Sequence, residues 1–250
     1  MSRAVNMLII DKPKQLARIE EKRRTVLRWL ASEGYSTEKV LGELLGLQRN
    51  AIYKTIKGME RDGLIQRHEL RSLMGKLAVL VGTPHGIAMG KDAVASEDWR
   101  DVESIGRIAV SSIAHGLDVQ TVRVKAIKVG WADWISDRKA HKLSAEDGWL
   151  KIPDSIAVSP DGEVIAIEVE RTIKTRKRYE AIISAYLQMI KKGKIASVVY
   201  VCPDADVAPR LSRIFESIDA VPVAGNRVSI NDEHRAKFIF TSLERWPNHG

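Results

Sequence analysis

The sequence has one cysteine, no long apolar run and no clustered histidines. Cys202 alone excludes a disulfide framework and any zinc knuckle built from cysteine pairs, and it favours a reducing, cytoplasmic setting. No apolar run approaches the roughly 20 residues that a membrane span needs. No basic segment followed by an apolar stretch opens the chain, so we expect neither secretion nor a membrane partner. The six histidines form neither HxH nor HExxH, which disfavours a histidine-rich metal site.

What the chain does have is clustered positive charge. Its 250 residues are 44% hydrophobic and 29% charged, enough for a packed core in one large domain or two modest ones. The net charge is +8. Residues 1–75 hold 15 Lys and Arg against 9 Asp and Glu, and residues 171–194 hold 8 against Glu180 alone. Two solvated helix faces would account for this, but clustered cations also suit a polyanionic partner, nucleic acid above all.

The first part of the chain predicts three helices. Apolar residues recur at helical spacing from Ile19, and Gly34 is the expected stop. Ser36 is expected to cap a second helix that ends at Gly46, and a third helix is expected at residues 49–62.

A two-stranded ribbon is expected next, within residues 65–82. This order is typical of a winged helix-turn-helix, which we place at residues 16–85. If Ile52, Ile56 and Met59 face inward, the outer face of the third helix is basic and suits reading of the DNA major groove. The residues expected to contact DNA here are Arg49, Asn50, Tyr53, Lys54 and Lys57 on the helix, with Arg67 and Arg71 on the wing. The alternative is a small helical bundle that binds protein or dimerises.

Residues 86–250 predict an α/β domain, so the chain as a whole is α+β. Helical periodicity covers residues 99–114, and residues 131–142 are expected to be a connector or a strand edge. From Trp149 onward, strands alternate with helices. Apolar residues 196–202 suit a central strand that is buried on both faces.

One strand of this domain carries two carboxylates. Side chains alternate along residues 164–170, so Glu168 and Glu170 share a face. If residues 160–162 form a three-residue loop, Asp154 lies opposite Glu168 on that same face, and glycine at the third loop position favours this register. A two-residue loop would turn Asp154 to the other face.

Three converging carboxylates repel one another unless a cation lies among them. Oxygen-only ligands favour Mg²⁺ or Mn²⁺, so Asp154, Glu168 and Glu170 are the expected metal ligands. Exposure of the three side chains to solvent is the simpler alternative.

These residues also carry a resemblance. Pro153-Asp154, a 13-residue spacer, Glu168-Val169-Glu170 and a following basic helix resemble the PD-(D/E)xK nuclease superfamily, with its restriction-endonuclease-like core. Glu170 stands where that motif usually has lysine, so Lys174 or Arg171 would have to supply the positive charge. With a winged helix ahead of it, the stretch IAIEVERTIKTRKRYEAI resembles the MobC-type plasmid relaxases and the related replication-relaxation proteins.

The resemblance implies a metal-dependent endonuclease of plasmid mobilisation or conjugation, a relaxase that nicks one strand at a transfer or replication origin. Its expected partners are duplex DNA with a locally melted or nicked strand, and mobilisation accessory proteins. The catalytic set would be Asp154, Glu168, Glu170 and Lys174. The residues expected to hold phosphate in this domain are Arg171, Arg176, Lys177 and Arg178.

Other features allow other interpretations. The rival function is a non-catalytic, sequence-specific DNA-binding plasmid protein, a repressor or accessory factor, with a degenerate nuclease fold. His115 and Asp118 are either the polar edge of a buried helix or an upstream addition to the site. Tyr179 and Tyr186 suit a core better than a nucleophilic role, and Cys202 suits an inert core thiol.

Overall fold

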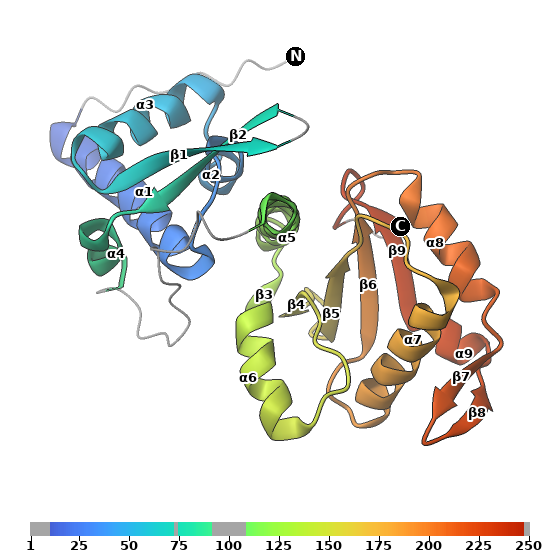
Figure 1. Cartoon of the computed structure of the whole chain (residues 1–250). Helices are drawn as coiled ribbons and strands as arrows, with labels where there is room; N and C mark the ends of the chain where they lie inside the picture. The colour runs from blue at the N-terminus through green and yellow to red at the C-terminus, as the bar shows by residue number, and fades with distance from the viewer. Residues whose placement is uncertain (1–10, 73–74, 92–108, 248–250) are drawn as a thin grey trace, which may run out of the picture. The chain divides into compact units, whose positions relative to one another are not determined.

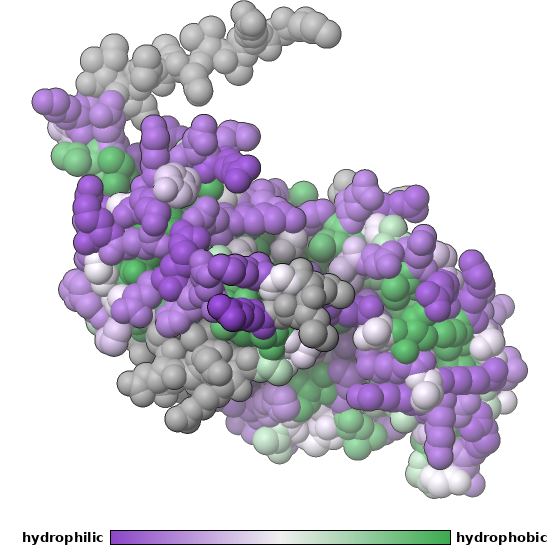
Figure 2. Space-filling view, turned by 45° about the horizontal axis from the view of Figure 1, so that its top comes forward, coloured by the Kyte–Doolittle hydropathy of each residue, from purple (hydrophilic) through white to green (hydrophobic). Residues whose placement is uncertain are grey.

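The structure, a computed structural model, describes residues 11–72, 75–91 and 109–247. The chain divides into two compact units, Met1–Ser112 and Ile113–Gly250 (Figure 1). None of the helices in the described ranges is long and apolar enough to cross a membrane. The face seen in Figure 2 is mainly hydrophilic, with hydrophobic residues in separate patches.

The first unit begins with three helices: α1 at Lys12–Glu33, α2 at Glu38–Leu45 and α3 at Arg49–Arg61. Helix α1 starts seven residues before Ile19, where the periodicity begins, because Pro13 is tolerated in a first helical turn. The expected cap of α2 is also wrong. Thr37 is the cap and its side chain accepts a hydrogen bond from Val40 N, whereas Ser36 pairs with Leu80 of the ribbon. Gly46 ends α2 in the left-handed conformation, as predicted.

The ribbon follows α3 directly. Strands β1 (Ile65–Ser72) and β2 (Gly75–Gly82) pair antiparallel, from Ile65 opposite Gly82 to Ser72 opposite Gly75. Ile52, Ile56 and Met59 on α3 are buried, together with Leu80 of β2. Three helices followed by this ribbon confirm the predicted winged-helix arrangement.

A fourth helix, α4 (Pro84–Lys91), completes the first unit and was not predicted. It packs against α1. The approach is close because α4 presents glycine: a Cβ on Gly86 would lie 2.0 Å from the Leu64 carbonyl oxygen, and one on Gly90 would lie 2.9 Å from that of Leu27. The unit therefore extends past residue 85, the expected boundary, and the chain divides between residues 112 and 113.

We expect Gly86→Ala to destabilise the first unit by about 1–3 kcal/mol, because the added methyl forces α4 away from the Leu64 carbonyl. Calorimetric unfolding of the full chain measures the loss. Gly58→Ala is the matched control: its Cβ would meet nothing closer than Arg23 at 3.6 Å, and alanine is the better helix former by about 0.5–1 kcal/mol. Equal stability of the two variants would contradict the close packing of α4.

The second unit begins within the first turn of α5 (Val110–Ile127), which is followed by β3 (Ala132–Ser136) and α6 (Asp137–Asp147). The helix expected at residues 99–114 falls mostly outside the described residues, and α5 continues the same periodicity. The expected connector at residues 131–142 is instead a strand joined directly to a helix. Ser136 makes that join possible, because its side chain accepts a hydrogen bond from Lys139 N and caps α6.

Five strands form the sheet of this unit, in the order β3-β4-β5-β6-β9. Strands β3, β4 (Ser155–Val158) and β5 (Val164–Val169) are antiparallel neighbours. Strands β6 (Ser197–Cys202) and β9 (Phe238–Ser242) continue the sheet parallel to β5. Although strands are expected from Trp149 onward, residues 150–152 are not in a strand, and Leu150 is 71% exposed.

Helices cover both faces of this sheet. Helices α7 (Arg176–Lys191) and α8 (Val207–Glu216) lie along one side of the sheet (Figure 1). They bury Tyr179, Tyr186 and Phe215 in the core on that face. Helix α5 packs on the other face, with Trp131 and Trp246. A hairpin of β7 (Ala220–Val223) and β8 (Asn226–Ser229) and the short α9 (Asp232–Arg235) precede β9. The second unit is therefore a mixed α/β layer structure, as predicted.

Candidate nucleic-acid interface and carboxylate site

The outer face of α3 is polar and accessible. Its inward residues Ile52, Ile56 and Met59 are at most 4% exposed. The five outward residues that the sequence singled out are all exposed: Arg49, Asn50, Tyr53, Lys54 and Lys57. Lys57 already forms an ion pair, since its ammonium lies 2.7 Å from a carboxylate oxygen of Glu60. The helix therefore offers guanidinium, amide and ammonium groups on one surface.

The wing residues differ from each other. Arg67 donates to carboxylates of Glu38 and Glu60, which joins β1 to α2 and α3. Its guanidinium is held within the first unit, and a phosphate contact by Arg67 stays a prediction. Arg71, near the end of β1, is exposed. The sequence could not reveal the role of Arg67, because its two acceptors lie 29 and 7 residues away.

The β4–β5 hairpin adopts the three-residue register. Ser159 N donates to the Glu163 carbonyl oxygen at 2.9 Å, and Gly162 has φ +85°. Ser155 pairs with Ile167, so Asp154 comes opposite Glu168 as predicted. The Asp154 carboxylate folds back on β5 and accepts a hydrogen bond from Val169 N at 2.8 Å. The hairpin thus brings the two acidic side chains together.

Glu168 is a buried carboxylate with two donors on one oxygen. It is 7% exposed, and its Oε1 accepts hydrogen bonds from Lys151 Nζ at 2.5 Å and from the Tyr186 hydroxyl. Burial and the nearby Asp154 charge raise the pKa of Glu168 to about 7, against the opposing effect of Lys151. A carboxyl group with this pKa can exchange a proton near neutral pH.

Asp154 is paired with a histidine from α5. His115 Nε2 lies 3.2 Å from Asp154 Oδ1. Burial opposes ionisation of Asp154, but the hydrogen bond and the charge of His115 outweigh it and lower the Asp154 pKa. The same hydrogen bond, against burial, raises the pKa of His115. His115 thus contacts Asp154, and its role as an addition to a catalytic site stays a prediction.

We expect His115→Gln to lower the stability of the second unit by less than about 1 kcal/mol, since His115 is 37% exposed. The contribution of His115 is complete below pH about 6.5 and declines as pH rises through its raised pKa. That of Asp154 is complete above pH about 4 and declines as pH falls through its lowered pKa. The difference between wild type and variant in urea unfolding should therefore be largest between these limits. A difference that grows above pH about 8 would contradict the pairing.

Glu170 lies apart from this pair. It is 4% exposed, and its Oε2 accepts hydrogen bonds from Lys174 Nζ and, at 3.1 Å, from the Tyr179 hydroxyl. Arg171 is bonded to Asp118 of α5. The two candidates for the missing motif lysine therefore each have a carboxylate partner away from Glu168.

The remaining basic residues lie at the start of α7. Arg176, Lys177 and Arg178 are all exposed. Arg176 donates to the Ser217 carbonyl oxygen at 2.5 Å and pairs with Glu180. Phosphate binding by this group stays a prediction.

Among the residues that the structure describes, no three His, Cys, Asp or Glu side chains are grouped so as to hold a metal ion. The predicted set of Asp154, Glu168 and Glu170 therefore stays a prediction, with Asp154 and Glu168 facing each other and Glu170 beside α7. The carboxylate oxygens of Asp154 and Glu168 are of the ligand type that Mg²⁺ and Mn²⁺ prefer.

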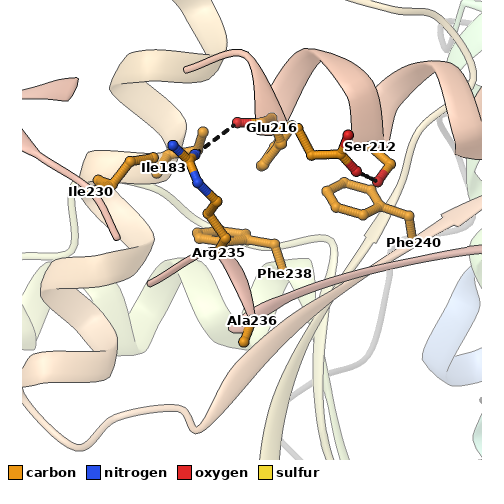
Figure 3. Close-up of a pocket in the computed structure, with 9 residues that line it drawn as sticks. Ile183, Ser212, Glu216, Ile230, Arg235, Ala236, Phe238 and Phe240 are labelled. Carbon is orange, nitrogen blue, oxygen red and sulfur yellow. Dashed lines mark hydrogen bonds between the residues drawn. The ribbon is translucent and has the colours of Figure 1, made fainter. Parts of the chain in front are cut away.

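A cavity of about 180 Å³ lies elsewhere in the second unit, between α8, α9 and β9 (Figure 3). Its walls include Phe215, Phe238 and Phe240, and Arg235 lies beside them. Arg235 donates to the carbonyl oxygens of Phe215 and Ile218, so it stabilises the end of α8. The cavity is smaller than the usual range of ligand pockets, about 300–1,000 Å³, and no predicted site residue lines it.

No protein-family model matches the sequence, and no curated protein matches it. Two solved structures are similar to parts of it. One is a MepR mutant from a multidrug-resistant S. aureus clinical isolate, 16% identical, covering 41% of this chain and 79% of that chain with a TM-score of 0.27. The other is a MarR family regulator from Neisseria meningitidis, 23% identical, covering 55% and 87% with a TM-score of 0.27. At these TM-scores neither similarity supports a functional argument.

Proposed function

We propose that the protein binds double-stranded DNA through the outer face of α3. One observation carries this: in a winged-helix unit, the exposed face of the third helix is the basic one, with Arg49, Asn50 and Lys54 on it. Arginine suits guanine edges and asparagine suits adenine edges in the major groove, while lysine neutralises phosphate. The ribbon β1–β2 would lie along the backbone, with Arg71 near its tip.

The test is selection of duplexes from a random library with the full chain, followed by affinity measurements at several salt concentrations. We expect an enriched site and an affinity that falls steeply with salt, as phosphate neutralisation requires. If the selected duplexes share no enriched sequence, the proposal that α3 contacts specific bases would be contradicted.

A second candidate function is metal-dependent nicking of DNA by the second unit, as the relaxase resemblance implies. The supporting observation is the facing pair of Asp154 and Glu168, one on each arm of the β4–β5 hairpin. The chain order α5, β3, α6, β4, β5, α7, β6 also matches a nuclease core of the resembled kind, apart from α6, which is inserted between the first two strands.

In this candidate function Asp154 and Glu168 would hold Mg²⁺ or Mn²⁺, which polarises a phosphate and acidifies a bound water. The chain's own groups would do the rest. His115 would hold the Asp154 carboxylate in place, and Tyr186 would do the same for Glu168. The exposed Lys177 and Arg178 would bind the phosphate backbone of the locally melted or nicked strand. Mobilisation accessory proteins would be further partners in this candidate function. If plasmid carrying the selected site stays supercoiled with either metal, the protein is the non-catalytic DNA-binding alternative.

A further inference from the structure

Lys57 belongs to a network of ion pairs on the surface of the first unit. Its Nζ is 2.7 Å from Glu60 Oε2 and lies over the Tyr53 ring, 5.9 Å from the centroid. Glu60 Oε1 accepts a second hydrogen bond, from Arg67 Nε at 3.0 Å. Arg67 in turn donates to a carboxylate oxygen of Glu38 on α2. The network therefore connects the outer face of α3 to the wing and to α2.

The charges of this network balance. Burial opposes ionisation of Glu60, but the hydrogen bonds from Lys57 and Arg67 outweigh it and lower the pKa of this carboxyl group. Glu60 and Glu38 therefore supply two negative charges against two positive ones. A neutral group releases few counterions from DNA, because that release requires cations that neutralise phosphates. Lys57 is thus less suited to a phosphate than Lys54, which is exposed and has no carboxylate partner among the described residues.

The network also restricts the direction of the Lys57 ammonium. Glu60 accepts one of its three N–H donors, and Tyr53 lies beside it. The Lys57 side chain is still 50% exposed, so other donors are accessible. An ammonium that is already held loses less side-chain freedom on binding, which favours a directional contact. In the major groove, guanine offers two acceptors that suit a lysine, N7 and O6.

We propose that Lys57 contacts the edge of a guanine in the major groove, and that Glu60 and Arg67 are positioning residues that hold Lys57 for this contact. The inference rests on the DNA-binding proposal and adds one feature to the bound duplex, a G·C pair at a defined place. Lys57 follows Arg49 by eight residues, about two turns of α3, so this pair differs from the one that Arg49 contacts. Arg67 then acts through Glu60 and not through a phosphate.

The test uses the full-length protein and the selected duplex, with each G·C pair of the site replaced in turn by A·T. In fluorescence anisotropy, Lys57→Met should lower the affinity for the selected duplex about tenfold and remove the preference for one G·C pair. The slope of log affinity against log salt concentration should stay as in wild type. Lys54→Met is the matched control: it should weaken binding to all duplexes and reduce that slope by about one.

Glu60→Gln and Arg67→Met test the positioning role. Each should reduce the preference for the same G·C pair by about threefold or more, and neither should reduce it further when combined with Lys57→Met, since both act through Lys57. Glu69→Gln is the control, because it also removes a wing carboxylate that pairs with a lysine, Lys76, and it should keep the preference. Thermal unfolding checks that each variant is folded.

The possible outcomes separate this inference from the DNA-binding proposal. If Lys57→Met weakens binding to all duplexes equally and reduces the salt slope, Lys57 contacts phosphate and the inference is overturned, while DNA binding by α3 stands. A selected site without a G·C pair would have the same meaning. If Glu60→Gln and Arg67→Met both keep the preference that Lys57→Met loses, the positioning role is overturned. A selection that enriches no sequence would overturn both proposals.

Discussion

Replacing Arg49 and Asn50 together with alanine should weaken binding to the selected duplex about 100-fold, since each good base contact is worth about 1–3 kcal/mol. Both side chains lie in the first turn of α3, and the first residues of such a helix reach the base edges. Neither is buried, so the loss should be in affinity and not in stability. Fluorescence anisotropy with the selected duplex measures the change.

The control is Arg61→Ala, which removes the same charge from the last turn of α3, where Arg61 pairs with Asp62. It should change the affinity by less than about threefold. Lys54→Ala should weaken binding to the selected duplex and to unrelated duplexes alike. It should also reduce the slope of log affinity against log salt concentration by about one, because one phosphate contact is lost. If the Arg49 and Asn50 substitutions weaken all duplexes equally, the two residues contact phosphate and do not read bases.

Glu168→Gln and Asp154→Asn should each lower nicking of site-bearing supercoiled plasmid about 100-fold or more, because each removes a charged oxygen from the proposed metal pair. The measurement is conversion of supercoiled to relaxed plasmid with Mg²⁺ or Mn²⁺. Binding to the selected duplex should be unchanged, because the substitutions lie in the second unit and α3 lies in the first.

The matched control is Glu163→Gln, an exposed carboxylate at the turn of the same hairpin. It should nick as wild type does. Activity that survives both Glu168→Gln and Asp154→Asn would show that this pair does not perform the nicking, whereas DNA binding by α3 would be unaffected by that result.

The register of the β4–β5 hairpin and the inward face of α3 could both be predicted from the sequence. Side chains of β5 alternate between its two faces, and the glycine at the third position of the turn favours the observed register over the two-residue alternative, so the meeting of Asp154 and Glu168 could be predicted. Helical periodicity likewise fixes which residues of α3 face inward, since Ile52 and Ile56 recur at one turn and are both buried. In both cases the pattern lies within about fifteen residues of chain.

What the sequence missed depends on contacts between distant segments. Arg67 pairs with Glu38 and Glu60 on two other elements, and the sequence alone could not decide between the two interpretations of His115, which contacts Asp154 from a helix 39 residues earlier. The cap of α2 shifted from Ser36 to Thr37 because Ser36 is drawn into pairing with Leu80. Lys151 was overlooked for another reason: it lies outside the motif, and only the folded hairpin brings it to Glu168.

The most direct test of the account is dimethyl sulfate probing of guanine N7 on the selected duplex, with and without the protein. Insertion of α3 into the major groove predicts that wild type protects guanines at the centre of the site, and that Arg49→Ala loses protection at one base pair. A duplex whose guanine N7 atoms stay fully reactive while the protein is bound would contradict reading of the major groove by α3.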